Sequence, residues 1–261
     1  MRSNIIDQLQ YYSFESFPSE QVIHGIFTRK GGVSPAPWNT LNIGGNNGDP
    51  RENVIENRKR MFEALELRVE TIFDVWQVHS AEVVCTDIPR PLDAPHFKAD
   101  AILTNKPGVT LLMRFGDCVP ILLYDPPHHV IGLVHAGWLG TVRKTLAATI
   151  QTMKMKYSTI PEDIIAGIGP SIGPDHYEVG EDVIKHGKLA FETRSEELFF
   201  KNSSSQIHFD LWAANKLILE QSGVKNIQVA QICTACHFDE WFSHRAEKAK
   251  TGRFGALIAL R

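Results

Sequence analysis

Two reactive side chains border a pair of short apolar segments in the middle of the chain. Cys118 opens the first segment, His135 closes the second, and Asp125-Pro126-Pro127 lies between them. Both segments are rich in Val, Ile and Leu, too short for helices and bounded by residues that break regular structure, which is typical of buried strands. Because proline ends strand pairing, the pattern predicts an antiparallel hairpin with a tight turn over residues 116–138.

The predicted hairpin would bring the thiol and the imidazole together. If Tyr124 pairs with Val130 across the turn, Cys118 and His135 lie opposite each other to within one residue. Opposed side chains have Cβ atoms about 4.5–5.5 Å apart, within reach of a shared metal ion or a thiolate–imidazole pair. A slip of one residue would separate them. We therefore expect the turn at residues 125–129 to hold both side chains on one face.

Three sets of residues could carry chemistry. The first is a zinc site of His79, Cys118 and His135, because two imidazoles and a thiolate suit this ion and leave a fourth position for water or substrate. The second is metal-free, with Cys118 as nucleophile and His135 as its base. The third is Cys233-x-x-Cys236, a redox pair or half a zinc site. Since no second such pair exists, we interpret these cysteines as two small buried hydrophobic residues.

The rest of the chain mixes strands and helices. Strand patterns occupy residues 22–28, 71–87, 99–104, 109–115, 164–168, 225–233 and 254–260. Helix patterns occupy residues 50–67, 181–192, 211–222 and a segment from Thr141 to about 156, and residues 200–206 read as a polar loop. Asp49, Thr141 and Asp210 are predicted N-caps, and Gly223 is a predicted C-terminal stop. His79 falls in a half-buried strand pattern, where a single histidine is more often structural than a ligand.

These elements predict one domain of residues 1–261. Strands and helices do not alternate strictly, and no repeat or linker interrupts the chain, so we expect a mixed α/β (α+β) fold. A net charge of −3 favours neither a nucleic-acid nor a membrane partner. The N-terminus lacks the apolar core of a signal peptide, and no apolar run is long enough to span a bilayer, so a cytoplasmic protein is expected.

A long loop over residues 28–49 contains a further candidate site. Arg29 and Lys30 precede paired glycines there, so that backbone N–H groups could face an anion, although a flexible solvated turn is an equal alternative. The helix that follows His135 also begins within a few residues of it. Since a helix N-terminus carries free N–H donors and partial positive charge, it too suits an anion.

Several short motifs, taken together in this order, resemble one family. They are Thr28-x-Lys30 with Gly31-Gly32-Val33-Ser34, Leu41-Asn42-x-Gly44, Asn57-Arg58, Gln77-Val78-His79, Asp117-Cys118-Val119-Pro120, His135-Ala136-Gly137-Trp138, Gly169-Pro170, Tyr177-Glu178-Val179-Gly180, Cys233-Thr234, Phe242-Ser243-x-Arg245 and Gly252-Arg253. On these motifs the chain resembles the laccase-domain family, once called multicopper polyphenol oxidases. The resemblance covers residues 22–261, and its Asp-Cys-x-Pro and His-Ala-Gly-Trp blocks are specific.

The resemblance implies a zinc enzyme of purine nucleoside metabolism. Its implied reactions are phosphorolysis of adenosine, inosine, guanosine and methylthioadenosine, and deamination of adenosine. The family's metal ligands map onto His79, Cys118 and His135, which would also be the catalytic residues. The implied fold is a single domain of layered mixed sheets flanked by helices, related to toxin deamidases that use a Cys–His pair. Some members carry a laccase label, and others are described as editing factors for cell-wall precursors.

Substrate groups are assigned from position and chemistry. Candidates for holding phosphate or nucleoside are Arg29, Lys30, Asn42, Arg58, Trp138 and Arg245, with Phe242 as a second stacking residue. For deamination, Glu178 or Asp117 would move protons. The sequence departs from the family pattern at Leu139, where a cation is common, and at Gly116, where alanine is common. Loss of the cation could weaken anion binding.

Three alternatives to this function remain at this stage. One is a metal-free Cys118–His135 hydrolase that acts on an amide, and another is a protein whose metal is only structural. The third is a copper-dependent polyphenol oxidase. Multicopper oxidases bring many imidazoles together in His-x-His pairs, and none of the 11 histidines is two residues from another. Copper oxidation is therefore disfavoured, although copper could replace zinc, since its general affinity for such ligands is higher.

Overall fold

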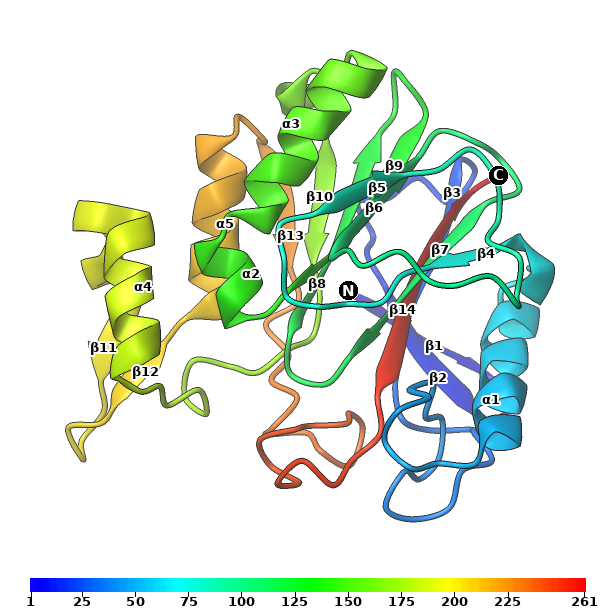
Figure 1. Cartoon of the computed structure of the whole chain (residues 1–261), viewed down its shortest axis with the longest axis horizontal. Helices are drawn as coiled ribbons and strands as arrows, with labels where there is room; N and C mark the ends of the chain where they lie inside the picture. The colour runs from blue at the N-terminus through cyan, green and yellow to red at the C-terminus, as the bar shows by residue number, and fades with distance from the viewer.

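Two mixed sheets of six strands each form the centre of the fold in the computed structural model, which describes residues 1–261 (Figure 1). The first sheet, in spatial order, contains β1 (Arg2–Ile6), β2 (Leu9–Ser13), β3 (Val22–Phe27), β14 (Phe254–Leu260), β7 (Thr110–Phe115) and β4 (Ile72–Asp74). The second contains β13 (Asn226–Val229), β10 (Ile165–Ile168), β8 (Val119–Asp125), β9 (Val130–Ala136), β6 (Ala101–Thr104) and β5 (Val83–Cys85). A separate hairpin pairs β11 (Phe199–Lys201) with β12 (Ile207–Phe209).

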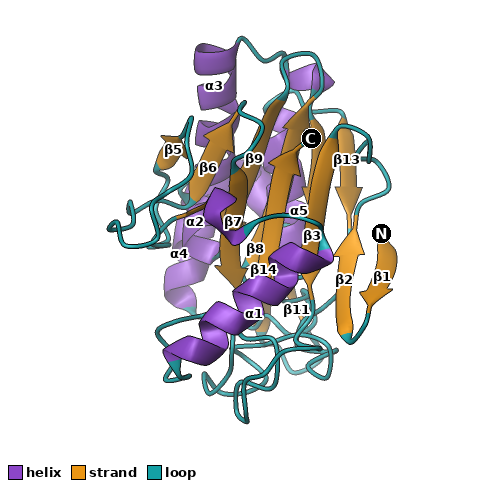
Figure 2. Cartoon of the chain, turned by 90° about the vertical axis from the view of Figure 1, so that its right-hand side faces the viewer, coloured by secondary structure: helices purple, strands orange, loops and turns teal.

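Helices cover the outer faces of the stacked sheets. The helices are α1 (Arg51–Ala64), α2 (Trp138–Val142), α3 (Thr145–Tyr157), α4 (Glu181–Phe191) and α5 (Leu211–Gln221). Figure 2 shows α1 on the near side of the sheets and α3 and α5 on the far side. The layers therefore run helix, sheet, sheet, helix. The predicted mixed α/β architecture with layered sheets and flanking helices is confirmed.

The central strands β8 and β9 are buried on both faces, which explains their continuous apolar sequences. On β8, Ile121 and Leu123 pack with the helices α3 and α5, whereas Leu122 and Tyr124 pack between the two sheets. Neighbouring residues of a strand point to opposite faces, so both sets are needed. All four are fully buried, and burial of each large apolar side chain contributes about 1.5–3 kcal/mol.

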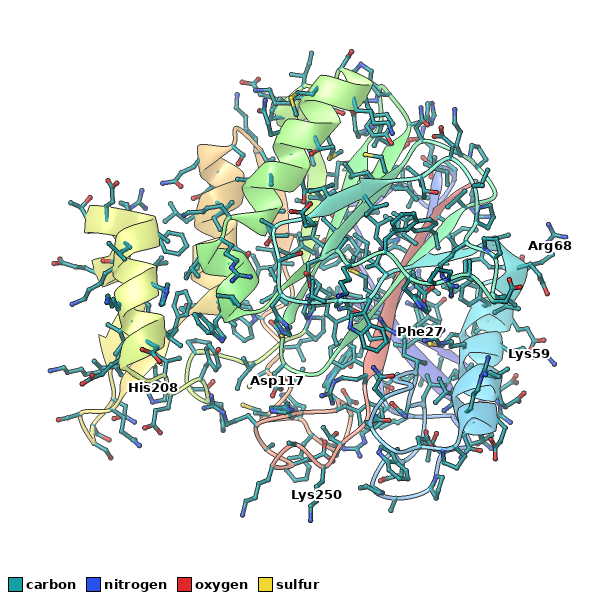
Figure 3. The ribbon with its side chains drawn as sticks, in the orientation of Figure 1. Phe27, Lys59, Arg68, Asp117, His208 and Lys250 are labelled. Carbon is teal, nitrogen blue, oxygen red and sulfur yellow. The ribbon has the colours of Figure 1, made fainter.

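The outer face of the first sheet is closed by α1. Its Met61 and Phe62 are buried in one cluster with Phe27 from β3. Figure 3 shows Phe27 inside the fold, with Lys59 and Arg68 directed away from it toward solvent. This division between an apolar and a charged face is typical of an amphipathic helix on a protein surface.

The helix boundaries confirm one predicted cap and contradict another. Asp210 caps α5 as predicted by accepting a hydrogen bond from the Ala213 N–H at 2.9 Å, and Gly223 follows with φ +93°. By contrast, α1 begins at Arg51 and ends at Ala64, within the predicted 50–67, and Asp49 does not cap it. The Asp49 carboxylate accepts hydrogen bonds from side chains, including those of Ser34 and Asn42 in the preceding loop.

The predicted helix from Thr141 to about 156 is two helices in the structure. Lys144 between α2 and α3 has φ +61°, a left-handed conformation that interrupts the helix. Thr141 lies inside α2 rather than at its start, and its hydroxyl accepts a hydrogen bond from Asn215 of α5. The predicted cap is therefore wrong, because the chain turns into a helix directly after Gly137.

Three predicted segments also differ from the structure in length or in kind. The segment 71–87 contains the separate strands β4 and β5, joined by a loop, and the segment 225–233 contains only the short β13. The expected polar loop at 200–206 is the end of β11 and the turn of the β11–β12 hairpin. None of the helices combines the length and the apolar character needed to cross a bilayer.

A buried histidine gives the fold a predictable pH dependence. His24 on β3 is 8% exposed, and its Nε2 accepts a hydrogen bond from the Phe14 N–H at 2.8 Å. Burial disfavours the imidazolium and lowers the pKa of His24 to about 4. Below the ordinary pKa of about 6.5, the unfolded chain binds the proton that the folded chain rejects. Stability is therefore lost as the pH falls from about 6.5 toward 4.

We predict that the free energy of unfolding falls by about 2 kcal/mol between pH 7 and pH 4.5 through His24 alone. The variant His24→Gln keeps a side-chain acceptor for Phe14 but does not titrate, so its pH dependence should be smaller by that amount. Urea unfolding of both proteins at several pH values measures the difference. Parallel curves for the two proteins would contradict the prediction.

Candidate active site

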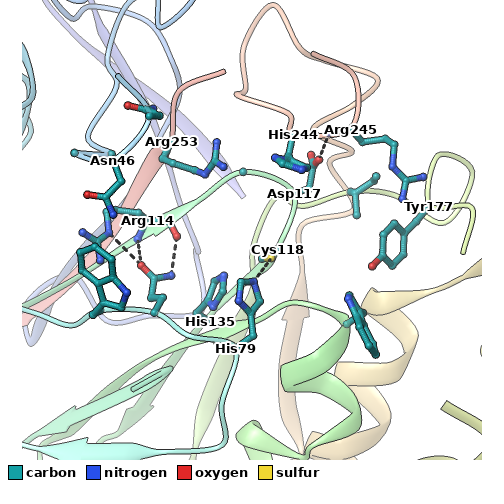
Figure 4. A pocket seen from close by; sticks show the side chains of 18 residues that line it. Asn46, His79, Arg114, Asp117, Cys118, His135, Tyr177, His244, Arg245 and Arg253 are labelled. Carbon is teal, nitrogen blue, oxygen red and sulfur yellow. Dashed lines mark hydrogen bonds between the residues drawn. The ribbon is translucent and has the colours of Figure 1, made fainter. Parts of the chain in front are cut away.

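Cys118, His79 and His135 meet at one end of the second sheet (Figure 4). Their ligand atoms all lie within 4.8 Å of one another, and Cys118 Sγ is 3.9 Å from His79 Nε2. The centroids of the two imidazole rings are 5.0 Å apart. The structure thus brings together the three residues from which the sequence predicted a metal site, and we call them the Cys-His-His trio.

The β8–β9 hairpin has a register that differs by one residue from the predicted one. Asp125, and not Tyr124, is the partner of Val130. The turn is made by residues 126–129 and leaves Asp125 in the ladder, where its carboxylate bonds His128 Nδ1 at 2.9 Å. The predicted Tyr124–Val130 pair is therefore wrong.

Both reactive side chains nevertheless point to the same face of the hairpin. Pro120 lies directly opposite His135 in the ladder. Cys118 precedes Pro120 by two residues, and alternate residues of a strand share a face. Cys118 is therefore a diagonal neighbour of His135, close enough for their functional atoms to meet.

The absence of a side chain at Gly137 makes room for the sulfur of Cys118. Gly137 follows β9, and a Cβ atom at this position would lie 2.7 Å from Cys118 Sγ and 3.2 Å from His79 Cδ2. Both distances are shorter than van der Waals contact. The glycine of the His-Ala-Gly-Trp block is thus required by the close approach of the trio.

His79 reaches the site from a loop, where the sequence predicted a strand. It lies between β4 and β5, is exposed and has φ +58°. The buried carboxylate of Asp100 holds this loop: its Oδ2 accepts hydrogen bonds from the backbone N–H groups of Val78 at 3.2 Å and Ser80 at 2.6 Å. The Ser80 hydroxyl donates a third bond at 2.8 Å. These bonds stabilise a conformation that non-glycine residues adopt only rarely.

Asp100 also orients the second imidazole. Its Oδ1 lies 2.9 Å from His135 Nδ1, and its backbone carbonyl accepts a bond from the His135 N–H at 2.8 Å. With Nδ1 engaged, Nε2 of His135 faces Cys118. Burial raises the pKa of Asp100, but the bonds from His135 and Ser80 prevail and lower it to about 2. The carboxylate is therefore a permanent anion in the interior.

The trio is electrostatically coupled. Burial raises the pKa of Cys118, but the charge of His135 and bonds with His135 and His79 prevail and lower it to about 6. Burial lowers the pKa of His135, whereas the Cys118 charge and the bond with Asp100 raise it to about 9. In the absence of a metal ion, the site thus holds a thiolate beside an imidazolium at neutral pH. A thiolate is both the metal-binding and the nucleophilic form of cysteine.

A cavity of about 570 Å³ opens next to the trio, a size that accommodates a small organic ligand. Besides the trio it is lined by Gly44, Gly45, Asn46, Asn47, Trp76, Gln77, Arg114, Gly116, Asp117, Trp138, Ile172, Tyr177, His244, Arg245 and Arg253. Figure 4 shows the labelled members of this set around the cavity. Arg114 lies in β7 and Trp138 begins α2, whereas the other members come from loops at the ends of the sheets.

Three arginines of the cavity have no carboxylate partner. Arg114 bonds the backbone carbonyl of Val75 and the side chain of Gln77, Arg245 bonds the carbonyl of Glu178, and Arg253 bonds the carbonyl of Gly252. Burial lowers the pKa of Arg114 to about 10 and also lowers that of Arg253. Arg114 and Arg253 are half-buried and Arg245 is exposed, and no carboxylate neutralises any of them, so an anion in this cavity would be stabilised.

The one carboxylate of the cavity is engaged elsewhere. Asp117 accepts hydrogen bonds from the Thr234 hydroxyl and from the Arg245 backbone N–H, each at 2.7 Å. Its φ of +86° is unusual for a residue with a side chain, and these two bonds hold it in place. Asp117 therefore fixes the backbone from which Cys118 projects.

Two of the six predicted substrate residues line the cavity. Trp138 is the first residue of α2, and Arg245 lies over the ring of Tyr177 with 5.2 Å between the guanidinium carbon and the ring centroid. An arginine stacked on an aromatic ring is held flat against it. Both side chains are thus placed to contact a ligand.

The cations of the 28–49 loop do not line the cavity. Arg29 is 6% exposed, bonds Glu247 at 3.0 Å and lies over the Phe242 ring at 4.5 Å. Lys30 pairs with Glu240 at 3.2 Å. Phe242 itself is fully buried, so it does not stack on a ligand. The loop is anchored by these contacts rather than left open to an anion.

Asn42 and Arg58 also lie outside the cavity lining, where they support it. Arg58 bonds Asp74 at 3.4 Å and the Ile43 carbonyl at 3.2 Å. Asn42 is fully buried, and its Oδ1 accepts bonds from the backbone N–H groups of Gly44 at 3.0 Å and Arg253 at 2.8 Å. Asn42 therefore connects the loop at Gly44 and Gly45 to the segment that carries Arg253.

The two departures from the family pattern lie in different surroundings. Leu139 lines a small separate depression with Val142 and His186, not the main cavity. Gly116 lines the main cavity, where a Cβ atom would approach Arg253 Cδ to 3.0 Å. The missing methyl group thus leaves space beside the arginine.

Several residues of the site were not singled out from the sequence. They are Asp100, Trp76, Gln77, Arg114, Tyr177, His244 and Arg253. Gln77, Tyr177 and Arg253 belong to the motifs that carry the resemblance, so their membership in those blocks was an available signal. Arg114 and Asp100 belong to no such block, and only the strand pairing places them here.

The Cys233–Cys236 pair differs from its predicted interpretation. Cys233 is buried at 6% exposure, but Cys236 is exposed, so the two are not both buried hydrophobic residues. Their sulfurs lie beside Asp175 and His176, and the ligand atoms of all four residues are within 4.8 Å of one another. The chain thus has two groups of side chains that could hold a metal ion.

Comparisons with known proteins match nearly the whole chain. A family model described as "Multi-copper polyphenol oxidoreductase laccase" matches residues 23–261. The purine nucleoside phosphorylase of Deinococcus radiodurans is 36% identical over 93% of this chain and 91% of its own length. The purine nucleoside phosphorylase YlmD of Geobacillus stearothermophilus is 34% identical over 94% of this chain and 92% of its own length.

Solved structures show the same fold over nearly the whole chain. The crystal structure of YlmD from Geobacillus stearothermophilus has a TM-score of 0.92 and 32% identity, and the match covers 99% of this chain and 98% of that one. The Bacillus licheniformis protein YfiH has a TM-score of 0.89 and 29% identity, covering 98% and 97%.

We predict that Asp100→Asn weakens divalent metal binding at the Cys-His-His trio by about 10- to 100-fold, because carboxylates that orient histidine ligands have effects of this size. The affinity is measured by competition with a chromophoric chelator in a Cys236→Ala background, in which the second group of ligands is incomplete. Asp125→Asn is the matched control, since Asp125 is equally buried and also bonds a histidine, but far from the trio. Equal effects of the two substitutions would show that Asp100 has no special role.

Proposed function

Because the chain belongs to the multi-copper polyphenol oxidoreductase laccase family, and the relatives described above carry the name purine nucleoside phosphorylase, we propose that it catalyses the phosphorolysis of purine nucleosides. Its substrates would be a purine nucleoside and inorganic phosphate, and its products the free base and a sugar 1-phosphate. Adenosine, inosine, guanosine and methylthioadenosine are the proposed nucleosides.

The observation that carries this proposal is the set of three cavity arginines without carboxylate partners. The cavity is approached from different segments of the chain by Arg114, Arg245 and Arg253. Their positive charges are not neutralised by a carboxylate, which suits a dianion such as phosphate. Arginine binds phosphate oxygens through paired N–H donors. A cavity that binds only neutral ligands gains nothing from such an arrangement, since unpaired cations that are half-buried, such as Arg114 and Arg253, are unfavourable.

The aromatic lining fits the other substrate. Trp76, Trp138 and Tyr177 face the cavity, and their rings offer stacking surfaces to a purine. The amides of Asn46, Asn47 and Gln77 also line it and can donate or accept hydrogen bonds. These groups would orient the base and the sugar relative to the phosphate.

The Cys-His-His trio is proposed to hold zinc. A thiolate and two imidazoles are ligands that zinc prefers, and three protein ligands leave one position for substrate. The donor set supports this assignment, because Asp100 fixes the tautomer of His135 and the surroundings favour the Cys118 thiolate. When bound, a zinc ion supplies Lewis acidity that neutralises charge on a phosphate oxygen.

In the reaction, a bond forms between a phosphate oxygen and C1′ of the sugar while the C1′–N9 bond breaks and its electron pair goes to the purine. The arginines would hold the nucleophile and offset its charge, which positions it for attack. The departing base needs a proton or a hydrogen bond. His244 lines the cavity, belongs to neither metal ligand group and is exposed, which makes it the proposed donor.

Deamination of adenosine is a second proposed activity, but the geometry supports it less well. Such a reaction uses a carboxylate to move protons between water and the base. The two carboxylates considered for this role are occupied: Asp117 bonds Thr234 and Arg245, and Glu178 Oε2 accepts a bond from Gln206 at 2.8 Å. Phosphorolysis needs no such carboxylate.

The alternatives make different demands on the trio. A thiol hydrolase would use Cys118 and His135 without a metal, and their coupled charges are compatible with that chemistry. A multicopper oxidase would need further imidazoles around a copper cluster, whereas the two ligand groups of this chain contain three histidines in total. We therefore propose phosphorolysis and treat the thiol hydrolase as the competing function.

One assay separates these functions. The purified protein is incubated with adenosine, with and without phosphate, and the products are resolved by chromatography. We expect adenine and ribose 1-phosphate only with phosphate, loss of activity on chelation, and its return on addition of zinc. Formation of inosine would indicate deamination. Activity that survives chelation but is lost in Cys118→Ser would support the thiol hydrolase and contradict the zinc enzyme.

We predict that Arg253→Ala raises the KM for phosphate by about 10- to 100-fold, because a hydrogen bond to a charged group contributes about 1.5–3 kcal/mol. The KM for the nucleoside should change much less. Initial rates at varied phosphate concentrations measure the effect, with Lys154→Ala on the exposed face of α3 as a control for the loss of one positive charge. A uniform decrease in kcat with an unchanged phosphate KM would contradict the proposed role.

A further inference from the structure

A second group of metal-ligating side chains lies outside the cavity lining, where the segment that follows β10 meets the segment that follows β13. It consists of Asp175, His176, Cys233 and Cys236, and we call it the Cys-x-x-Cys cluster. Asp175 and His176 are neighbours in one turn, and the two cysteines are three residues apart in the other. Two soft sulfurs, an imidazole and a carboxylate are the donor types from which zinc sites are built.

From this geometry we propose that the Cys-x-x-Cys cluster is a structural zinc site that joins the two turns. It is distinct from the Cys-His-His trio, shares no residue with it, and does not depend on the phosphorylase function proposed above. The donors number four, as in structural zinc sites, whereas the trio leaves one position open.

Three distances within the cluster match the edges of a tetrahedral zinc site. Zinc–sulfur bonds of about 2.3 Å and zinc–nitrogen or zinc–oxygen bonds of about 2.0–2.2 Å imply edges of roughly 3.4–3.8 Å. His176 Nδ1 lies 3.8 Å from Cys233 Sγ and 3.5 Å from Cys236 Sγ, and Cys236 Sγ lies 3.5 Å from Asp175 Oδ2. The Asp175–His176 edge is shorter, at 3.0 Å, because these two side chains bond each other directly.

Two backbone N–H groups are also directed at the sulfur of Cys233. The N–H groups of Gly173 and Cys236 point at Cys233 Sγ, at 3.1 Å and 3.4 Å. A thiolate accepts such bonds far better than a neutral thiol, as with other charged acceptors. A Cβ atom at Gly173 would lie only 2.9 Å from Cys233 Cβ. The absence of a side chain at Gly173 therefore allows the two turns to pack closely.

A disulfide explains this arrangement less well. It would use the two sulfurs alone, and both cysteines are free thiols in the structure. The imidazole of His176 lies in contact with both sulfurs, and Asp175 contacts one of them. A metal ion uses all four groups and compensates their negative charge, whereas a disulfide leaves Asp175 and His176 without a role.

The proposed zinc would stabilise one wall of the cavity. Tyr177 follows His176 directly and supports Arg245, which also bonds the His176 carbonyl at 3.2 Å. On the other turn, Thr234 follows Cys233 and donates to Asp117, which precedes Cys118. The residues next to the cluster therefore contact Arg245 on one side of the cavity and, through Asp117, the segment of Cys118 on the other.

Metal stoichiometry tests the site without reference to activity. The full chain is purified under reducing conditions, reconstituted with zinc and freed of loosely bound metal, and zinc is measured by elemental analysis. We expect two ions per chain in the parent protein, one in Cys118→Ala, one in Cys236→Ala and none in the double variant. Cys85→Ala is the matched control, since Cys85 belongs to neither group, and it should keep both ions.

Cobalt gives a second readout that identifies the ligands. In the Cys118→Ala protein, which keeps only the Cys-x-x-Cys cluster, bound Co²⁺ should show thiolate charge-transfer absorption and the intense visible bands of a tetrahedral site. Further removal of Cys236 should abolish both, and Asp175→Asn should weaken binding. Chelation should lower the Tm of Cys118→Ala by several degrees and leave the Tm of the double variant unchanged.

Three results would overturn the proposal. Cys118→Ala could retain no zinc while the parent retains one, which would leave the trio as the sole site and the phosphorylase proposal intact. Cys236→Ala could bind as much zinc as the parent, which would show adventitious binding. Mass spectrometry could find a Cys233–Cys236 disulfide that binds no cobalt after reduction, which would assign the pair to redox chemistry. Conversely, loss of metal from the trio alone would leave the cluster proposal standing.

Discussion

The candidate site depends on one buried carboxylate. Asp100 is fully buried at the start of β6, where one of its oxygens bonds His135 and the other bonds the backbone on both sides of His79. A single anion thus fixes the orientation of one imidazole and the loop conformation of the other. Without it, several buried donors would lose their acceptor, and each such loss costs about 1–3 kcal/mol. The antiparallel pairing of β6 with β9 is what brings this carboxylate to the hairpin.

Much of the fold could be predicted because local chemistry determined it. The apolar runs at 119–125 and 130–136 are uninterrupted since both of their faces are buried, and Asp210 has no competing partner that would draw it from its helix. Asp49 shows the limit of this reasoning. Its sequence context is that of a helix cap, but Ser34 and Asn42 of the loop before the helix donate hydrogen bonds to the carboxylate instead. The register of the hairpin likewise depended on how many residues the turn used.

The site was predictable in part, for a similar reason. The three residues of the trio are reactive types within specific motifs, and their convergence needed only one hairpin and one further loop. The cations were harder to assign, because a sequence does not show which of them meets a carboxylate. Arg29 pairs with Glu247, 218 positions away, whereas Arg253 meets only carbonyl groups. In the sequence, Arg114 is one polar residue in a strand pattern, and only the position of β7 beside the cavity shows that it lines the site.

The two halves of the cavity belong to different sheets. Cys118 and His135 adjoin strands of the second sheet, whereas Arg114 and Arg253 adjoin strands of the first. Phe115 lies between them, with its ring 5.5 Å from that of His135 and 5.8 Å from that of Phe254. Arg114 and Arg253 therefore reach the cavity from one layer of the fold, and Cys118 and His135 reach it from the other. Phe115 is not part of the cavity lining, but its packing between His135 and Phe254 contributes to the spacing between these two layers.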